Sequence, residues 1–274
     1  MGGSIEHDYA PSCELYERLL RPTLFEPYVI DLAHRVADLT EGSITEGSVL
    51  EMACGTGILT RQLRTQLKPS MPLTATDINL GMLQYAQSKL KDLNAIEWKE
   101  ADIANLPFRD GSFSTAVCPF GLMFVSERDR AFREMRRVLV NGGRLAVSVW
   151  DCMEANPWGV AVHDTVMTLF LDNPPQFFKA PFIFADVELL RGLLSANGFD
   201  QITIQAVPME CYSSSAESLA VGMIEGGPLL AEIQQGGSPE PVVNTVATAF
   251  ARLGGNSPFR TTMQAIAVTA RARG

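Results

Sequence analysis

A glycine-rich turn between a strand pattern and a helix pattern is the feature that most constrains the fold of this chain. Residues 48–57 read Ser-Val-Leu-Glu-Met-Ala-Cys-Gly-Thr-Gly, and a helical pattern follows over residues 58–68. Glycine lets a backbone approach a ligand closely and take conformations that a side chain forbids. Turns between strand and helix are where open α/β sheets bind nucleotides. The turn therefore predicts an α/β sheet with a nucleotide site, although a plain helix-entry turn stays open as an alternative.

The second predicted strand, residues 72–77, ends in Asp77. A carboxylate at this position can accept hydrogen bonds from both hydroxyls of a ribose, which indicates an adenosine site. The dinucleotide pattern G-x-G-x-x-G is incomplete, because Gly55 and Gly57 are followed by Thr60 where the third glycine belongs. No Gly-Lys-Ser/Thr follows either, so a phosphate-binding P-loop is disfavoured.

Four motifs occur in order over residues 48–150. They are Glu51–Gly57, Thr76–Leu83, Glu100–Ile103 with Leu106–Phe108 and Asp110–Phe113, and Arg133–Leu145. In this order and at these intervals they resemble class I S-adenosylmethionine (SAM)-dependent methyltransferases. The resemblance is greatest to the ubiquinone/menaquinone-biosynthesis group, also called methyltransferase type 11.

The resemblance implies a Rossmann-like α/β fold with helices on both faces of the sheet and a helical cap. Its seven-stranded mixed sheet has the order 3-2-1-4-5-7-6, with the last strand antiparallel. It also implies an enzyme that uses SAM as methyl donor and leaves S-adenosyl-L-homocysteine (SAH).

Hydrophobic periodicity places strands and helices alternately along the chain, which indicates parallel strands joined by right-handed helical crossovers. Strands are predicted at residues 48–53, 72–77, 95–100, 113–119, 143–150, 201–207 and 262–271, and helices at 58–68, 80–91, 127–139 and 186–196.

One methyltransferase domain is expected over residues 1–274. It would comprise an N-terminal helical cap (1–40), a SAM-binding core (48–150) and acceptor-side segments with insertions (151–260). We expect Pro22 and Pro27 to divide the helical stretch 9–39 into two helices. The aromatic-rich segment 156–184 is interpreted as a cap or lid, and residues 215–253 as a mostly helical insertion.

The resemblance assigns twelve residues to the donor site: Glu51, Ala53, Cys54, Gly55, Gly57, Asp77, Ile78, Met82, Asp102, Ile103, Cys118 and Phe120. Glu51 would fix the donor's amino group, the glycine turn its methionyl part and Asp77 the ribose diol. Met82 would pack on the adenine face, while Asp102 and the Ile103 backbone would contact the adenine edge. Cys118 and Phe120 follow strand four, near the reacting methyl.

Each assignment has a structural alternative. Asp77 can be the N-cap of the helix that begins near residue 80, and Asp102 can cap its own loop. Met82 and Phe120 can be ordinary core residues.

Methyl transfer is an in-line displacement in which the protein mainly supplies alignment. A general base is needed only where the acceptor's proton is not lost easily. Candidates by their location near the cap are His163, Tyr16, Asp151 and Asp164. His163 also fits an ordinary core or surface histidine, and no catalytic residue is assigned.

Composition excludes several classes of function. The net charge of −9 argues against nucleic acid and anionic membranes as partners. No apolar run reaches the roughly 18 residues of a transmembrane helix, and the N-terminus lacks a signal-peptide pattern. Five cysteines without a close pair and three histidines predict no metal site. We expect a cytoplasmic monomer or homodimer.

The aromatic-rich segment favours a small, fairly apolar acceptor, methylated at O, C or N. The alternative is a SAM-binding cyclase or isomerase that does not methylate, since such a protein keeps the same donor motifs. A nicotinamide oxidoreductase is disfavoured by the missing third glycine.

Overall fold

The computed structural model describes residues 13–41, 47–171, 175 and 177–274, and the chain forms two compact units. The first unit comprises residues 1–27, 152–180 and 208–264; the second comprises 28–151, 181–207 and 265–274. Each unit is therefore assembled from segments that are distant in sequence. The domain boundaries expected from the sequence stay predictions.

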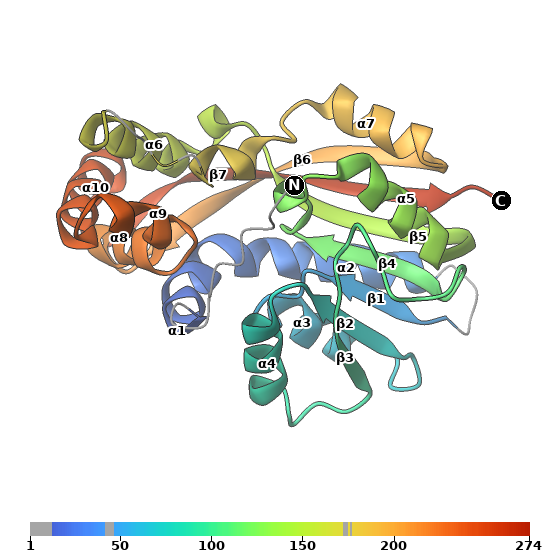
Figure 1. Cartoon of the computed structure of the whole chain (residues 1–274). Coiled ribbons are helices and arrows are strands. Elements are labelled where there is room, and N and C mark those ends of the chain that lie inside the picture. The colour runs from blue at the N-terminus through green and yellow to red at the C-terminus, as the bar shows by residue number, and fades with distance from the viewer. Residues whose placement is uncertain (1–12, 42–46, 172–174, 176) are drawn as a thin grey trace. The chain divides into compact units, whose positions relative to one another are not determined.

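A seven-stranded sheet has the order β3-β2-β1-β4-β5-β7-β6 (Figure 1). The strands are β1 (Val49–Met52), β2 (Leu73–Asp77), β3 (Ile96–Glu100), β4 (Phe113–Pro119), β5 (Leu139–Trp150), β6 (Phe199–Ser213) and β7 (Phe259–Ala272). Strands β1 to β5 pair in parallel, and β7 runs antiparallel to β5. The predicted fold class and strand order are confirmed.

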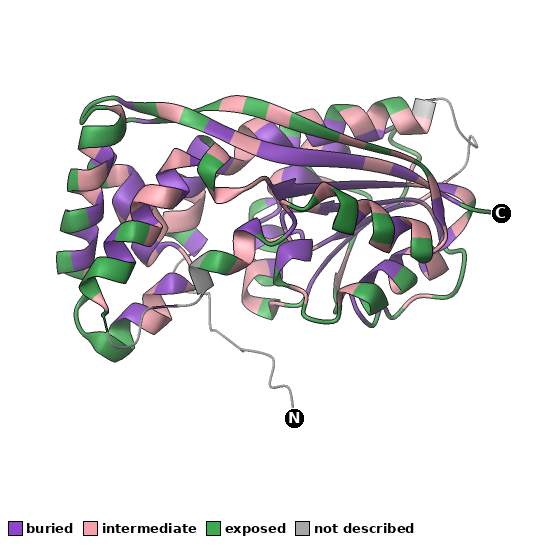
Figure 2. Ribbon diagram, turned by 90° about the horizontal axis from the view of Figure 1, so that it is seen from above, coloured by how far each residue is buried: buried purple, intermediate pink, exposed green. Residues whose placement is uncertain are grey.

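The helices of the second unit are α2 (Glu26–Glu41, from residue 28 on), α3 (Ile58–Gln66), α4 (Leu80–Lys89), α5 (Arg128–Val138) and α7 (Val187–Ala196), with the 3-10 turn η3 (Leu122–Phe124). An apolar cluster joins α2 and α3 to the sheet through residues such as Leu32, Leu63 and Val49. Figure 2 shows buried residues along the strands and exposed residues on the helix surfaces. The central strands β1, β2 and β4 are buried along almost their whole length, as expected of parallel strands covered on both faces.

Strands β5 and β6 are longer than predicted. The sequence places a helix at 127–139 and a strand at 143–150, but β5 begins directly after α5, at Leu139, and includes Asn141-Gly142-Gly143. Gly142 has φ +80°, and the pairing with β4 shifts register between Phe113 and Thr115. The glycines thus lie within an irregular strand. Sequence periodicity does not distinguish such a bulge from a turn.

Pro22 and Pro27 do not divide the N-terminal helical stretch, contrary to the sequence expectation. Residues 13–41 are helical throughout, as α1 (Cys13–Leu15), the π-helix η2 (Tyr16–Phe25) and α2. The Glu26 N–H donates to the Arg21 carbonyl, five residues back, so the hydrogen-bond spacing is that of a π-helix around Pro22. Pro27 lies in the first turn of α2, where a missing N–H costs little. Residues 9–12 lie outside the described residues.

The first unit is mostly helical. It contains η4 (Met153–Ala155), α6 (Pro157–Leu169), α8 (Ala216–Glu225), α9 (Leu229–Gly236) and α10 (Pro239–Gly254), and η5 (Phe177–Phe182) continues into the second unit. Helix α10 packs on α6 and α8, and α8 packs on η2. The mostly helical character predicted for residues 215–253 is confirmed, while their assignment as an insertion stays a prediction. Asn156, fully buried, donates to the Cys152 and Gln264 carbonyls and fixes the start of α6.

Candidate functional site

The ends of β1, β2 and β4 lie side by side in the second unit. Glu51 on β1 is paired in register with Ala75 on β2 and with Val117 on β4. The turn 53–57, the segment after Asp77 and the loop 118–122 therefore leave the sheet at one edge. This carboxyl edge is where open α/β sheets bind ligands.

The glycine turn needs conformations that side chains rarely take. Gly55 and Gly57 have φ values of +55° and +83°, and Ala53 also has a positive φ of +54°. A β-carbon at Gly57 would stand 2.9 Å from the Leu90 Cδ1 atom and 3.1 Å from the Ala86 Cβ atom, and the positive φ of Gly57 would strain any side chain there. Around Gly55, no heavy atom of the described residues lies within 4 Å of the position that a β-carbon would take. This face of the turn leaves its backbone accessible.

Asp77 lies at the end of β2 and is held by two backbone amides. Gly55 N–H donates to its Oδ2 atom at 2.8 Å, and Asn79 N–H donates to Oδ1 at 2.8 Å. Burial raises the pKa of Asp77, and hydrogen bonds from the Asn79, Gly55 and Ile78 backbones lower it. Each carboxylate oxygen can accept a further bond. The two loops thus orient a carboxylate with unused acceptor capacity.

Asn79, and not Asp77, caps α4. The Asn79 Oδ1 atom accepts from the Met82 N–H at 2.9 Å. Asp77 is therefore released from the alternative role of helix cap. Ile78 is 59% exposed beside it, Leu80 is 48% exposed and Met82 is half-buried. Apolar side chains thus adjoin the Asp77 carboxylate on an accessible surface.

Glu51 is a fully buried acid in the middle of an apolar strand. Among the described residues, neither of its carboxylate oxygens has a partner in hydrogen-bonding geometry. Burial raises the pKa of Glu51 to about 8; Thr60 lowers it and the nearby Asp77 carboxylate raises it further. A buried charge without a partner is costly. Among the described residues, hydrogen bonding from Thr60 offsets only part of this cost, so Glu51 keeps capacity for a ligand.

Asp102 and Ile103 follow β3 in a loop that is attached to Asp77. The Ala101 N–H donates to the Asp77 carbonyl at 3.0 Å. The Asp102 Oδ1 atom accepts from the Ala104 N–H at 2.8 Å, so this exposed aspartate does cap its own loop. Ile103 is buried. The second Asp102 oxygen leaves room for a ligand contact beside the capping role.

Cys118 and Phe120 lie at the end of β4. Cys118 is fully buried, and burial raises the pKa of its thiol to about 12. The Phe120 ring packs at 4.7 Å from the Trp150 ring and 5.7 Å from the Tyr28 ring, measured between centroids. Phe120 has a positive φ of +51°, and a β-carbon at Gly121 would collide with the Ala53 β-carbon. The loop 118–122 therefore touches the glycine turn.

Sequence reasoning missed the partners of Phe120. Tyr28 lies on α2, and its hydroxyl donates to the Val207 carbonyl at 3.1 Å; Trp150 ends β5. Both look like ordinary core aromatics in sequence. Only the parallel register of β4 and β5, which pairs Pro119 with Ser148, brings the ends of these strands together.

The candidate bases are spread over both units. Tyr16 on η2 stacks on Phe25 with centroids 5.2 Å apart, and His163 on α6 is half-buried; both belong to the first unit. Asp164 is exposed on the same helix, while Asp151 follows β5 in the second unit. The twelve residues assigned to the donor all belong to the second unit. The roles of the base candidates stay predictions.

Two further properties of the described part of the chain bear on its function. It holds no group of three or more His, Cys, Asp or Glu side chains arranged to bind a metal ion. Among its helices, none combines the length and the apolar character that crossing a membrane requires.

A family model described as a methyltransferase domain matches residues 50–147. Curated relatives are ubiquinone/menaquinone biosynthesis C-methyltransferases UbiE. The protein of Hahella chejuensis is 44% identical over 103 residues, which cover 36% of this chain and 41% of that protein. For the protein of Pseudomonas savastanoi pv. phaseolicola, identity is 39% over 183 residues, covering 62% and 71% of the two chains. With the Pseudomonas aeruginosa protein the match spans 66% of the relative.

Solved structures share the fold at low identity. The CurJ carbon methyltransferase superposes with a TM-score of 0.59 at 16% identity, covering 96% of this chain and 57% of that one. YcgJ of Bacillus subtilis superposes with a TM-score of 0.57 at 17% identity, covering 89% of this chain and 99% of that one. The [4+2]-cyclase SpnF superposes with a TM-score of 0.53 at 22% identity, covering 87% of this chain and 81% of that one. The fold is thus common to methyltransferases and to a cyclase, and does not by itself select the reaction.

The sheet order, the glycine turn after β1 and the acid at the end of β2 together define the class I SAM-dependent methyltransferase architecture. This chain belongs to the family of SAM-dependent methyltransferases that includes the ubiquinone/menaquinone biosynthesis C-methyltransferases.

Proposed function

We propose that this protein transfers a methyl group from SAM to a small, fairly apolar acceptor. The observation that carries the proposal is Asp77, whose two oxygens are oriented by amides of the glycine turn and of the segment before α4. A carboxylate held in this way at the second strand suits the two hydroxyls of a ribose.

The other residues at this edge fit the remaining parts of the donor. The unpartnered buried carboxylate of Glu51 complements an ammonium group. The accessible backbone around Gly55 suits the methionyl part, with Ala53, Cys54 and Gly57 shaping the turn. Apolar contacts to the base would come from Ile78 and Met82, polar contacts from Asp102 and Ile103, and contacts near the sulfur from Cys118 and Phe120.

Bound SAM supplies a methyl group on a positively charged sulfur. SAH, the neutral thioether, is the leaving group of the in-line displacement. The protein then has to bind the donor and the acceptor, align them with each other and exclude water. The Phe120 ring, fixed by Tyr28 and Trp150, presents an aromatic group of the kind that stabilises cations. Where the acceptor needs a base, His163 and Tyr16 are the candidates.

The acceptor is proposed to be a small molecule in the cytoplasm, bound by a monomer or homodimer. The net charge of −9 supports this over a nucleic-acid substrate. The relatives are named for C-methylation in ubiquinone and menaquinone biosynthesis. Phenolic and quinol compounds are therefore the first acceptors to screen, with methylation at carbon tested before oxygen or nitrogen.

The first test is calorimetric titration of the purified protein with SAH, SAM and NAD. We expect SAH and SAM to bind and NAD not to bind. Asp77→Ala should weaken SAH binding at least about tenfold, because charged hydrogen bonds to the ribose are lost. Asp92→Ala is the matched control, since the Asp92 side chain is 64% exposed and lies outside the proposed donor site. Failure of SAH to bind the wild-type protein would contradict the proposal.

The same preparation then separates methyl transfer from cyclisation. A methylated product is heavier than its acceptor by one carbon and two hydrogens, whereas a cyclised product keeps the acceptor's mass. Turnover with unchanged mass would replace the proposed reaction and leave the donor site intact.

A further inference from the structure

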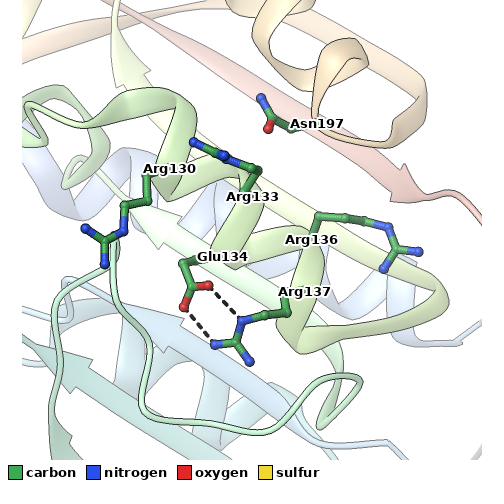
Figure 3. Close-up of a pocket in the computed structure, with 6 residues that line it drawn as sticks. All are labelled: Arg130, Arg133, Glu134, Arg136, Arg137 and Asn197. Carbon is green, nitrogen blue, oxygen red and sulfur yellow. Dashed lines mark hydrogen bonds and ion pairs between the residues drawn. The ribbon is translucent and has the colours of Figure 1, made fainter.

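Four arginines of α5 line a hollow together with Glu134 and Asn197 (Figure 3). Arg130 pairs with Glu127 at 3.1 Å and Arg133 pairs with Asp129 at 2.8 Å. Both pairs lie along the exposed surface of the helix. Arg136 instead donates to the Leu139 and Arg273 carbonyls and to the Asn141 Oδ1 atom. The guanidinium groups of the hollow are thus engaged by carboxylates or by carbonyl oxygens, which does not favour an anion-binding site.

The pair formed by Glu134 and Arg137 differs, because it reaches from α5 to another segment. Two parallel bonds of 2.7 Å join the Arg137 Nε and Nη2 atoms to the Glu134 carboxylate, as Figure 3 shows. Further N–H groups of Arg137 donate to carbonyls of the loop: Nη2 to that of Leu106 at 2.9 Å and Nη1 to that of Phe108 at 2.7 Å. Glu134 in turn accepts from the Leu106 N–H at 2.8 Å. We call this set of bonds the loop clamp.

The loop clamp holds the segment that directly follows Asp102 and Ile103. At its other end the same loop is attached to the donor site, since the Ala101 N–H donates to the Asp77 carbonyl at 3.0 Å. Between the two attachments, the Asp102 carbonyl accepts from the Asn105 N–H at 2.9 Å. The position of Asp102 is therefore set from both sides.

The loop clamp is well suited to a positioning role. Hydrogen bonding to Arg137 lowers the pKa of Glu134, and hydrogen bonding to Glu134 raises the pKa of Arg137, so the pair stays ionised. The two side chains are 17% and 30% exposed, less than the Arg130–Glu127 and Arg133–Asp129 pairs. Bidentate, partly buried pairs keep a defined geometry that exposed single pairs lack.

We propose that Glu134 and Arg137 are positioning residues of the donor site: they fix the loop 101–110 so that Asp102 and Ile103 can discriminate the purine base. This inference rests on the proposed function, because it takes the base to be the adenine of SAM. Neither residue itself contacts the ligand. Their removal is expected to change selectivity between bases rather than only the stability of the fold.

The test compares the binding of SAH and of S-inosylhomocysteine, in which a carbonyl oxygen replaces the exocyclic amine of adenine. Both ligands are titrated into the full chain by calorimetry. Wild-type protein should prefer SAH. Arg137→Met should weaken SAH about tenfold and leave S-inosylhomocysteine nearly unchanged, because the loop no longer presents its acceptor to the amine. Glu134→Gln keeps an acceptor for Leu106 and should show a smaller loss of preference.

Arg133→Met is the matched control, since Arg133 lies on the same helix and pairs with Asp129 of that helix. It should keep the wild-type preference. The inference is overturned if Arg137→Met and Glu134→Gln keep that preference while only their unfolding temperature falls, or if wild-type protein does not distinguish the ligands. If Arg137→Met does not fold, Glu134→Gln alone decides. If wild-type protein binds neither ligand, the proposed function itself fails.

Discussion

At the scale of single residues, the donor site holds two buried acids in opposite surroundings. Asp77 accepts hydrogen bonds of 2.8 Å from two backbone amides, whereas no group of the described residues forms a hydrogen bond of good geometry to Glu51, and only Thr60 lowers its pKa by hydrogen bonding. The protein thus uses part of the hydrogen-bonding capacity of Asp77 and leaves most of that of Glu51 for a ligand. An unsatisfied buried acid costs stability whenever it is ionised.

This cost predicts a pH-dependent effect of Glu51→Gln on the unliganded protein. Below pH 4.5, the ordinary pKa of a glutamate, the Glu51 carboxyl is protonated in both the folded and the unfolded protein. Between pH 4.5 and its folded-state pKa of about 8, it is protonated in the folded protein and ionised in the unfolded chain. The wild-type contribution to stability therefore falls as the pH rises across this window and is lost above it. Relative to wild type, Glu51→Gln should gain stability from about pH 5 to about pH 8, by on the order of 3 kcal/mol.

Urea denaturation at several pH values measures this gain. Glu154→Gln, which alters an exposed glutamate, provides the control and should show no comparable trend. A difference between Glu51→Gln and wild type that stays constant with pH would mean that Glu51 ionises normally in the folded protein.

At the scale of secondary-structure elements, the start of α4 ties helix formation to the site. Asn79 caps the helix through Met82, and Asp77 accepts from the Asn79 backbone. The same few residues thus end β2, begin α4 and place the apolar side chains of Ile78 and Met82. A change at the cap is expected to affect both folding and binding.

Asn79→Ala should lower the free energy of unfolding by about 1 kcal/mol, as loss of an N-cap does. It should also weaken SAH binding several-fold, because Ile78 and Met82 lose their fixed position. Ser238→Ala removes the cap of α10, where Ser238 accepts from the Glu240 N–H, and should affect stability alone. Equal SAH affinity in both variants would separate the cap from the donor site.

At the scale of the whole molecule, the residues assigned to the donor come from one of the two units. That unit is assembled from residues 28–151, 181–207 and 265–274, and the helices α8 to α10 belong to the other. Ligand binding stabilises the regions that it orders, and local opening differs between parts of a protein.

Hydrogen exchange with and without SAH should therefore show added protection at residues 53–57, 77–82, 101–106 and 118–121. Helices α8 and α10 should exchange at unchanged rates, because no donor residue is assigned to them. Mass spectrometry compares the exchange of the full chain without SAH and at saturating SAH. Protection concentrated in α8 to α10 would place the ligand elsewhere.

The order of elements, the glycine turn after β1 and the acid at the end of β2 can all be read from the chain, because they depend on local periodicity and turn chemistry. The strand order and the roles of the donor residues came from family resemblance, since periodicity does not encode pairing. The π-helix around Pro22 and the bulge at Asn141–Gly143 were not foreseen, because both depend on neighbouring strands and helices.

Which side chains complete the site depends on long-range packing. The unpartnered state of Glu51, the packing of Phe120 against Tyr28 and Trp150, and the clamp from Arg137 to Leu106 all join segments distant in sequence. In sequence, Arg137 is one of several arginines on an exposed helix, and nothing local distinguishes it from Arg133. The difference lies in what each guanidinium meets once the loop after β3 has been packed beside α5, and that is set by long-range contacts.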